Sequence, residues 1–371
     1  MATIALDATY TVDPEPSGIA VYSRRLIESL AEVATPHHFM LSYRLSRIRQ
    51  RHRFLRPLPK MRAGGPTFSV HLFQQPLTFW LPWQAELFHS LAQRPPAFRF
   101  RKEIVTVFDI FPITGDNYST PEFRRKFSLL LREAVMRAAC VITLSEHTAR
   151  QLAQHCNVAA ERIKVIPAGV DLPPDTLSQE ERLRRREEVV GAGHAMLLSV
   201  GVIQTRKNTL NALRALLLLP EKYKLVLAGG GDGYGHEAVY EFIRSARLEP
   251  RVIPLGYVSE ECLSVLYEAA TVFLFPSFEE GFGIPVLEAM AHGVPVVTSN
   301  TSSLPEVGGA AALYVNPHDP SDIAEKIVRA TEDNDLRSKM ITEGSARARE
   351  FTWGRAAEQT CRVYNEVLGE A

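Results

Sequence analysis

The chain has 371 residues, and at a typical domain size of about 100 to 200 residues this length predicts two domains. The composition, 46% hydrophobic and 23% charged, excludes collagen-like, coiled-coil and intrinsically disordered proteins. The formal net charge is zero and does not favour nucleic-acid binding, although residues 1–171 carry +8 (22 Lys and Arg, 14 Asp and Glu) and residues 172–371 carry −8 (20 and 28).

The first half of the chain alternates short apolar runs with longer stretches of helical spacing. An amphipathic helix is expected at 21–33, after the first apolar run and a polar loop. This order is typical of a parallel α/β domain. The predicted strands of this half cover residues 3–6, 39–43, 104–107, 141–144 and 163–166.

The second half repeats the alternation more regularly. Its predicted strands cover residues 196–200, 224–228, 252–255, 272–275, 295–298 and 313–315. Between the halves, Pro173 and Pro174 continue neither helix nor strand, and a charged helix is expected at 179–190.

We therefore expect an α/β protein of two Rossmann-like, doubly wound parallel-sheet domains, at 1–172 and 173–352. Loops at the carboxyl ends of the strands are expected to face each other across a ligand-binding cleft. A last helix, within 353–371, is able to pack on either domain, the N-terminal one included.

The densest pattern of candidate functional residues lies at 275–290, where a strand is followed by a glycine-rich turn and a helix. The backbone N–H groups of Phe282, Gly283 and Ile284 are expected to form an anion site at the positive end of that helix. A phosphate group fits such a site.

Two carboxylates flank this candidate phosphate site. Glu280 precedes the turn and Glu288 lies inside the helix, so both need neutral hydroxyls as partners if an anion binds between them. The pattern therefore indicates a nucleotide sugar. The alternative is that Glu280 is a solvated loop residue and Glu288 an ordinary glutamate favoured by the helix dipole.

A pair of basic residues, Arg206 and Lys207, follows the predicted strand at 196–200. Fixed positive charge in such a loop can neutralise a departing diphosphate, a task that metal ions perform in other enzymes. No D-x-D metal motif accompanies the pair, so neither a metal nor another cofactor is expected; the alternative is a solvated Arg–Lys pair. After the strand at 252–255, Val258 is a candidate for backbone contact with the nucleotide base.

These motifs resemble those of the retaining glycosyltransferases of family 4. Glu280 and Glu288 match the family's E-x7-E signature, and residues 199–208 (SVGVIQTRKN) match its VG…RKN loop. Near the N-terminus, residues 17–22 (SGIAVY) resemble its GGIGRY turn, and residues 105–112 (VTVFDIFP) resemble VTVHDLIP. The matches follow the family's order over nearly the whole chain.

The resemblance implies the GT-B fold, with an acceptor-binding N-terminal domain and a donor-binding C-terminal domain. The implied reaction moves a hexose from a nucleotide diphosphate sugar to a hydroxyl of a glycan or lipid-linked acceptor, with retention of configuration. The acceptor attacks on the face that the diphosphate leaves, and the leaving phosphate helps to take its proton. The alternatives are another sugar-nucleotide enzyme of this fold, such as an epimerase, and a non-catalytic sugar-nucleotide-binding protein.

The resemblance also implies roles for individual residues. Glu280 is expected to hold donor-sugar hydroxyls near the reacting carbon, and Glu288 the ribose hydroxyls. Gly18 is expected to admit the diphosphate close to the backbone; the alternative is a plain tight turn. The expected catalytic residues are Glu280, Arg206, Lys207 and Asp109. The expected donor-binding residues are Gly18, Gly201, Val258, Phe282, Gly283, Ile284 and Glu288.

The chain departs from the family pattern at Phe108, where the family usually has a histidine, and at Ser17, Val21 and Val202. A benzyl ring cannot make the hydrogen bond that this histidine donates to the donor sugar. We therefore expect a mild preference for a 6-deoxyhexose donor. The alternative is that Phe108 simply packs beneath the cleft.

The sequence also bears on location. The four cysteines lie far apart, and the N-terminus lacks the basic and apolar segments of a signal peptide, so a cytoplasmic location is expected. Residues 33–85 contain no Asp or Glu, and we expect their basic side chains to hold the N-terminal domain at the anionic inner face of the membrane; the alternative is a solvated basic loop. The basic residues of this segment are Arg44, Arg47, Arg49, Arg51, Arg53, Arg56, Lys60 and Arg62.

Three large aromatic residues lie near the end of the same segment. Phe79, Trp80 and Trp83 are expected in the core rather than in an acceptor groove.

Overall fold

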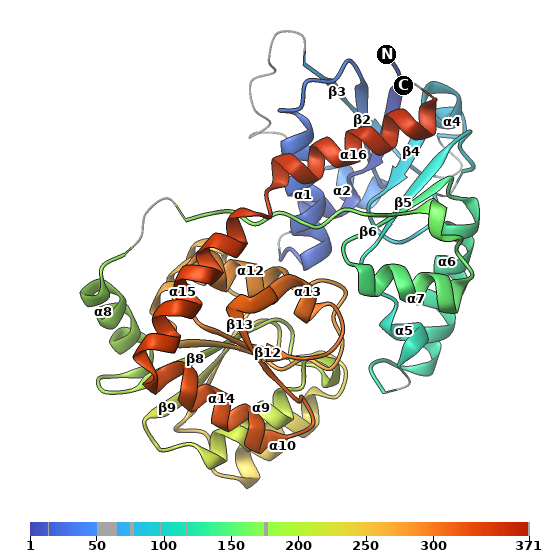
Figure 1. The fold of residues 1–371 in the computed structure, drawn as a ribbon. Coiled ribbons are helices and arrows are strands. Elements are labelled where there is room, and N and C mark those ends of the chain that lie inside the picture. The colour runs from blue at the N-terminus through green and yellow to red at the C-terminus, as the bar shows by residue number, and fades with distance from the viewer. Residues whose placement is uncertain are drawn as a thin grey trace. The chain divides into compact units, whose positions relative to one another are not determined.

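The chain forms two compact units in a computed structural model (Figure 1). The structure describes residues 1–13, 15–49, 65–74, 78–96, 98–115, 117–173 and 177–369. Unit 1 comprises residues 1–114, 122–169 and 351–371, and unit 2 comprises residues 115–121 and 170–350.

Unit 1 is built on a seven-stranded sheet in which all the paired strands are parallel. The strand order is β3-β2-β1-β4-β5-β6-β7. The strands are β1 (Thr3–Asp7), β2 (His38–Tyr43), β3 (Thr67–Leu72), β4 (Leu87–Ser90), β5 (Glu103–Val107), β6 (Cys140–Thr143) and β7 (Ile163–Val165).

Two strands of this sheet, β3 and β4, were not predicted from the sequence. The strand β3 lies at the edge of the sheet and is only partly buried, and its serine and histidine break the apolar pattern. The strand β4 has four residues, two of them polar, although all four are buried. Inner strands such as β6 are buried along their whole length and are mostly apolar, so their runs are recognisable in the sequence.

The helices of unit 1 end with α16, which lies along α1 (Figure 1). The predicted helix at 21–33 begins earlier, at Gly18, because the Ser17 hydroxyl accepts from the Ala20 N–H and caps the helix. The helical segments are η1 (Thr9–Val12), α1 (Gly18–Leu30), α2 (Leu45–Ile48), α4 (Leu81–Gln84), α5 (Phe111–Thr114), α6 (Pro121–Arg137), α7 (Glu146–Cys156), η2 (Ala160–Arg162) and α16 (Trp353–Leu368).

Polar contacts fasten α16 to the sheet of unit 1. The Tyr364 hydroxyl lies 2.7 Å from His89 Nδ1, and Asn365 Oδ1 lies 2.8 Å from His37 Nε2. Lys102 Nζ donates to the carbonyl of Val367 at 2.6 Å, near the negative end of the helix. The last helix of the chain is thus part of the core of unit 1.

Unit 2 is built on a six-stranded parallel sheet with the order β10-β9-β8-β11-β12-β13. Its strands are β8 (Ala195–Val200), β9 (Tyr223–Ala228), β10 (Val252–Gly256), β11 (Val272–Phe275), β12 (Val296–Ser299) and β13 (Ala312–Val315). Its helical segments are α8 (Gln179–Val190), η3 (Thr205–Lys207), α9 (Thr209–Leu218), α10 (His236–Ser245), α11 (Glu260–Ala269), α12 (Ile284–Ala291), α13 (Leu304–Gly308), η4 (Gly309–Ala311), α14 (Pro320–Glu332) and α15 (Asn334–Arg349). The prediction of two parallel-sheet α/β domains is confirmed.

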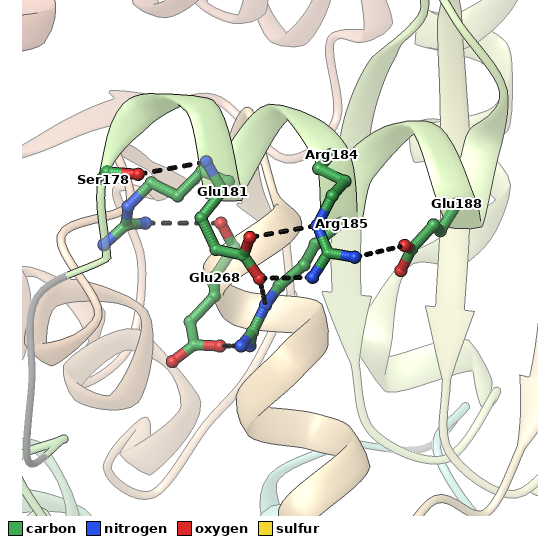
Figure 2. Close-up of polar contacts among 7 residues, drawn as sticks. Ser178, Glu181, Arg184, Arg185, Glu188 and Glu268 are labelled. Carbon is green, nitrogen blue, oxygen red and sulfur yellow. Dashed lines mark hydrogen bonds and ion pairs between the residues drawn. The ribbon is translucent and has the colours of Figure 1, made fainter.

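The charged helix α8 carries ion pairs along its own surface and is joined to α11 by the pair of Arg185 with Glu268, as Figure 2 shows. Glu181 Oε1 accepts from Arg184 at 2.7 Å and from Arg185 at 3.1 Å, and Arg185 also pairs with Glu268 of α11. Arg182 donates to the carbonyl of His292, at the end of α12, at 2.7 Å. The helix α8 therefore braces the two helices, α11 and α12, that carry part of the candidate site.

The prediction that Phe79, Trp80 and Trp83 lie in the core is wrong. Their exposed fractions are 58%, 45% and 78%. The helix α4 has only four residues, and Leu81 is the one that enters the aromatic core around Phe73. The other large side chains of this short segment point away from that core.

The predicted basic segment lies largely outside the described residues, which include only Arg44, Arg47 and Arg49 of its eight basic side chains. Arg47 lies 3.6 Å from the carboxylate of Asp13. Arg51, Arg53, Arg56, Lys60 and Arg62 belong to the part that is not described. None of the helices in the described ranges combines the length and apolarity that crossing a membrane requires.

Candidate functional site

The loop after β8 carries the predicted basic pair and is fastened to the loop after β11. Gly201 has a φ of +128°, a conformation that favours glycine, and its N–H donates to the carbonyl of Ala228 at 2.8 Å. Asn208 ends the loop and is buried. Its Nδ2 donates to the carbonyls of Pro276 at 2.8 Å and Pro317 at 2.7 Å. Asn208 thereby holds the basic pair against the segment that contains Glu280.

Arg206 and Lys207 both form ion pairs with Glu280. Arg206 NH1 lies 2.7 Å from Oε2 of Glu280, and Lys207 Nζ lies 2.8 Å from Oε1. Nζ also lies 4.5 Å from the centre of the Phe275 ring. The three charged side chains are 9%, 17% and 9% exposed for Arg206, Lys207 and Glu280, so solvent screens them weakly.

The Glu280 carboxyl is fully ionised in this environment. Burial alone would raise its pKa, but the charges of Arg206 and Lys207 and their hydrogen bonds outweigh burial and lower the pKa to about 2. A carboxylate with this pKa does not donate a proton at neutral pH. The three side chains together keep one positive charge, which suits an anionic ligand.

The segment of Glu280 is held by serines that follow β12. The Glu280 N–H donates to Ser302 Oγ at 3.2 Å, and Ser303 Oγ contacts the carbonyls of Glu280 at 2.8 Å and Phe282 at 2.7 Å. Gly283, directly before α12, has a φ of +122°, and a Cβ there would lie 3.0 Å from Leu304 Cδ2. The start of α12 therefore has a fixed backbone, as the anion site predicted at Phe282, Gly283 and Ile284 requires.

Glu288 lies one turn into α12 and is oriented by a buried tyrosine of α11. The Tyr267 hydroxyl donates to Oε2 of Glu288 at 2.8 Å. Burial first, and the Glu288 charge second, raise the pKa of Tyr267 well above its ordinary value, so this hydroxyl keeps its proton. The His292 ring stacks on Tyr267 with 5.2 Å between the ring centres. Glu288 itself is half-buried.

The structure brings one group of the predicted residues together in unit 2. Arg206, Lys207 and Glu280 are in contact, and a Cβ at Gly201 would lie 3.2 Å from Cε of Lys207. Val258 follows β10 and is half-buried. Within the described ranges, no three His, Cys, Asp or Glu side chains gather as a metal ion would need. Phe282, Gly283, Ile284 and Glu288 follow one another along the turn and α12.

Gly18 and Asp109 belong to unit 1. Gly18 is the first residue of α1, and nothing lies within 4 Å of a Cβ built there. The N–H groups of Asp109 and its neighbour Phe108 donate to Oε1 of Gln93, at 3.3 and 2.8 Å. The Phe108 ring is half-buried and packs edge-on against Tyr22, 5.0 Å between centres.

Sequence reasoning assigned no role to Asn208, Tyr267, Ser302 or Ser303. Asn208 had a signal, since it follows the basic pair directly in the matched loop. Tyr267 had none, because its contact with Glu288 joins two different helices. Side chains of this kind are found only once the helices are placed.

Two parallel-sheet α/β domains, the second with a paired basic and acidic cluster before a helix, define the architecture of a GT-B glycosyltransferase. Sequence comparison agrees. Residues 16–173 match the profile described as Glycosyltransferase Family 4, and residues 181–347 match that of Glycosyl transferases group 1. The chain belongs to this family of glycosyltransferases.

Several relatives carry the name of a mannosyltransferase. O-antigen chain mannosyltransferase B of Escherichia coli is 32% identical over 272 residues, covering 72% of this chain and 71% of that one. O-antigen chain mannosyltransferase RfbU of Salmonella typhimurium is 30% identical over 221 residues, 59% of this chain and 58% of that one. The serotype-specific mannosyltransferase WbdA of Escherichia coli is 28% identical over 275 residues, but the match spans only 34% of that longer protein.

Solved structures share the fold over the whole chain. HepE of Anabaena, solved in complex with UDP and glucose, has a TM-score of 0.76 at 17% identity and covers 99% of this chain and 100% of that one. Sucrose-phosphate synthase of Thermosynechococcus elongatus has a TM-score of 0.74 at 21% identity and covers 100% of both chains. At these identities the likeness concerns the fold alone.

Proposed function

We propose that this protein is a retaining glycosyltransferase that moves a hexose from a nucleotide diphosphate sugar to a hydroxyl of a glycan or lipid-linked acceptor. The observation that carries the proposal is the cluster of Arg206, Lys207 and Glu280 beside the start of α12. The names of the relatives favour mannose as the hexose and a bacterial surface polysaccharide as the product. The inner face of the cytoplasmic membrane is the proposed location, where the basic side chains of residues 33–85 would meet anionic lipid headgroups.

In this proposal unit 2 binds the donor. Arg206 and Lys207 neutralise the diphosphate as it leaves, without a metal ion or another cofactor. The N–H groups of Phe282, Gly283 and Ile284 bind phosphate oxygens at the positive end of α12. Glu288 accepts from the ribose hydroxyls and Glu280 from the donor-sugar hydroxyls. Gly201 leaves room for the diphosphate, and Val258 contacts the base through its backbone.

Unit 1 binds the acceptor in this proposal, and Gly18 and Asp109 are its contributions to the reaction. The acceptor oxygen bonds to the anomeric carbon on the face from which the diphosphate departs, as the bond from that carbon to the phosphate oxygen breaks. The acceptor proton passes to the leaving phosphate oxygen. Glu280 stays ionised throughout, in keeping with its low pKa.

The test combines binding and turnover. Nucleotide diphosphates and their sugars are screened by thermal shift, since a ligand at about 100 times its dissociation constant adds about 2.7 kcal/mol of stability. GDP-mannose and UDP-glucose are then supplied with and without an oligosaccharide acceptor. Transfer with retention supports the proposal, conversion of the donor sugar without acceptor indicates an epimerase, and binding without either reaction indicates a non-catalytic protein.

The contact between Tyr267 and Glu288 gives a prediction about affinity. Tyr267→Phe removes the hydroxyl that orients the Glu288 carboxylate. A hydrogen bond to a charged group is worth about 1.5 to 3 kcal/mol, so KM for the donor is expected to rise about 10- to 100-fold. Turnover at saturation should change little. The matched control is Tyr223→Phe, whose hydroxyl lies 3.5 Å from a carboxylate oxygen of Glu332. Equal effects of the two substitutions would show a general loss of stability.

Phe108 gives a prediction about the donor. Since its side chain has no hydrogen-bonding group where the family usually has a histidine, a 6-deoxy donor should be mildly preferred over the mannose donor on the same nucleotide. An apolar wall discriminates against an added hydroxyl by about 10²-fold at most. Competition for one acceptor measures the ratio. A preference above about a thousandfold for the 6-hydroxyl donor would show that a protein group other than Phe108 forms a hydrogen bond with the C6 hydroxyl of the donor sugar.

A further inference from the structure

Unit 1 exposes an aromatic cluster, Phe79, Trp80 and Trp83, that the proposed reaction does not use. Phe79 packs against both tryptophans, with 5.3 Å between the ring centres of Phe79 and Trp80 and 6.1 Å between those of Phe79 and Trp83. Trp83 is 78% exposed and Phe79 58%. Apolar patches that stay exposed on a folded protein commonly mark an interaction site.

The cluster lies at the amino edge of the sheet, away from the carboxyl edge where open α/β sheets bind their ligands. The helix α4 ends at Gln84, and β4 begins three residues later at Leu87. The Glu86 N–H between them donates to the carbonyl of Thr3, the first residue of β1. The aromatic cluster is therefore remote from the sheet edge at which Gly18 and Asp109 lie.

Two exposed arginines share this edge. Arg99 and Arg101 precede β5, which pairs in parallel with β4, so the segments before the two strands are neighbours. Between the arginines, Phe100 packs in the same core cluster as Leu81 of α4. The nearby Glu86 is exposed, and its carboxylate accepts from the Thr3 N–H at 3.0 Å.

We propose that this surface, the aromatic cluster flanked by Arg99 and Arg101, inserts into the headgroup region of an anionic lipid bilayer. Tryptophan and phenylalanine favour the boundary between headgroups and acyl chains, and arginines beside them bind lipid phosphates. The rings favour a bilayer over a glycan chain. The plane of the Phe79 ring meets those of Trp80 and Trp83 at 79° and 89°, so Phe79 forms no flat platform with either tryptophan on which a sugar ring could stack. The inference rests on the proposed membrane location and adds the surface that makes the contact. Because its test measures lipid binding and not enzymatic activity, its outcome does not depend on whether the proposed reaction is correct.

The tryptophans themselves report the contact. The chain has three, and Trp353 is 7% exposed, so a change in fluorescence on adding lipid comes from Trp80 and Trp83. With the full-length protein, phosphatidylcholine vesicles that contain phosphatidylglycerol should shift the emission to the blue, and brominated lipids should quench it. Vesicles of phosphatidylcholine alone should produce a much smaller effect, and salt should weaken the binding.

Variants test the same surface by cosedimentation with vesicles. Burying one aromatic side chain is worth about 1.5 to 3 kcal/mol, so a variant with both Trp80→Ala and Trp83→Ala should lose about 100-fold or more in vesicle affinity. Its melting temperature and its nucleotide binding should match those of the original protein. The control is Phe123→Ala, an aromatic residue 47% exposed on α6, which should bind vesicles normally.

Other outcomes would overturn the inference. Vesicle binding that leaves the emission unchanged, or that survives the double substitution, would place the membrane contact elsewhere on the chain. A blue shift that follows protein concentration without lipid, together with dimers in light scattering, would assign the cluster to a second copy of the chain. A shift on adding free oligosaccharide would assign it to a glycan.

Discussion

Replacing Lys207 by alanine is expected to lower turnover about 10²- to 10³-fold, the usual loss when one preorganised charged donor is removed from a reacting centre. Lys207 is fixed by Glu280 at 2.8 Å and by the Phe275 ring at 4.5 Å, so its ammonium group is already in place before the donor binds. Lys207→Arg keeps the charge and should recover part of the rate. Single-turnover kinetics with saturating donor measures this step.

The chain offers a matched control in Lys222, which also pairs with a carboxylate, Glu332 at 2.9 Å, and also lies over a ring, that of Tyr223 at 5.3 Å. It lies just before β9, at the amino edge of the sheet of unit 2. Lys222→Ala should leave turnover unchanged. EDTA should also leave turnover unchanged, because in the proposed mechanism Arg206 and Lys207 neutralise the leaving diphosphate without a metal ion. Loss of activity on chelation, restored only by a divalent ion, would contradict the proposed role.

Replacing Glu288 by glutamine is expected to weaken nucleotide diphosphate and nucleotide sugar alike, by about 10- to 100-fold, because both ligands contain the ribose. The substitution keeps the size of the side chain and leaves an oxygen that can still accept from Tyr267. Calorimetric titration with both ligands measures the effect. Melting temperatures show whether the variant is folded.

Glu280→Gln is the counterpart and should spare nucleotide binding while reducing transfer. The substitution removes the carboxylate that Arg206 and Lys207 share, so both cations are left buried with a weaker partner. The ligand-free variant should therefore melt at a lower temperature, while nucleotide diphosphate should add as much stability to it as to the original protein. Equal weakening of nucleotide binding by the two glutamine variants would refute the division of roles between Glu280 and Glu288.

Most of the fold was predictable because parallel strands buried on both faces appear as apolar runs. The strands β3 and β4 were missed for the opposite reason: the first is a partly exposed edge strand, and the second has four residues of which two are polar. The aromatic cluster was misassigned because large rings normally lie in the core. Only the brevity of α4 shows that Phe79, Trp80 and Trp83 cannot follow Leu81 inward.

The site was predictable as a set of residue types but not as an arrangement. The motifs of the sequence single out Arg206, Lys207 and Glu280 as ligand contacts. That these side chains also neutralise one another depends on the approach of two loops, which the buried Asn208 amide secures. The Tyr267 hydroxyl is a similar case, since a tyrosine on the buried face of a helix looks like any other core residue until its partner is located.

The packing of α16 on unit 1 affects how the protein is made. A ribosome delivers the chain from its N-terminus, so all seven strands of the first sheet emerge long before Tyr364 and Asn365, which bond to His89 and His37. Until unit 2 has been translated as well, α1 lacks its neighbouring helix and Tyr22 lacks Trp353. Until α16 has been made, the nascent N-terminal domain therefore keeps an apolar face exposed, where chaperones and proteases can bind. A transcript truncated within unit 2 would produce a protein in which this face is never covered.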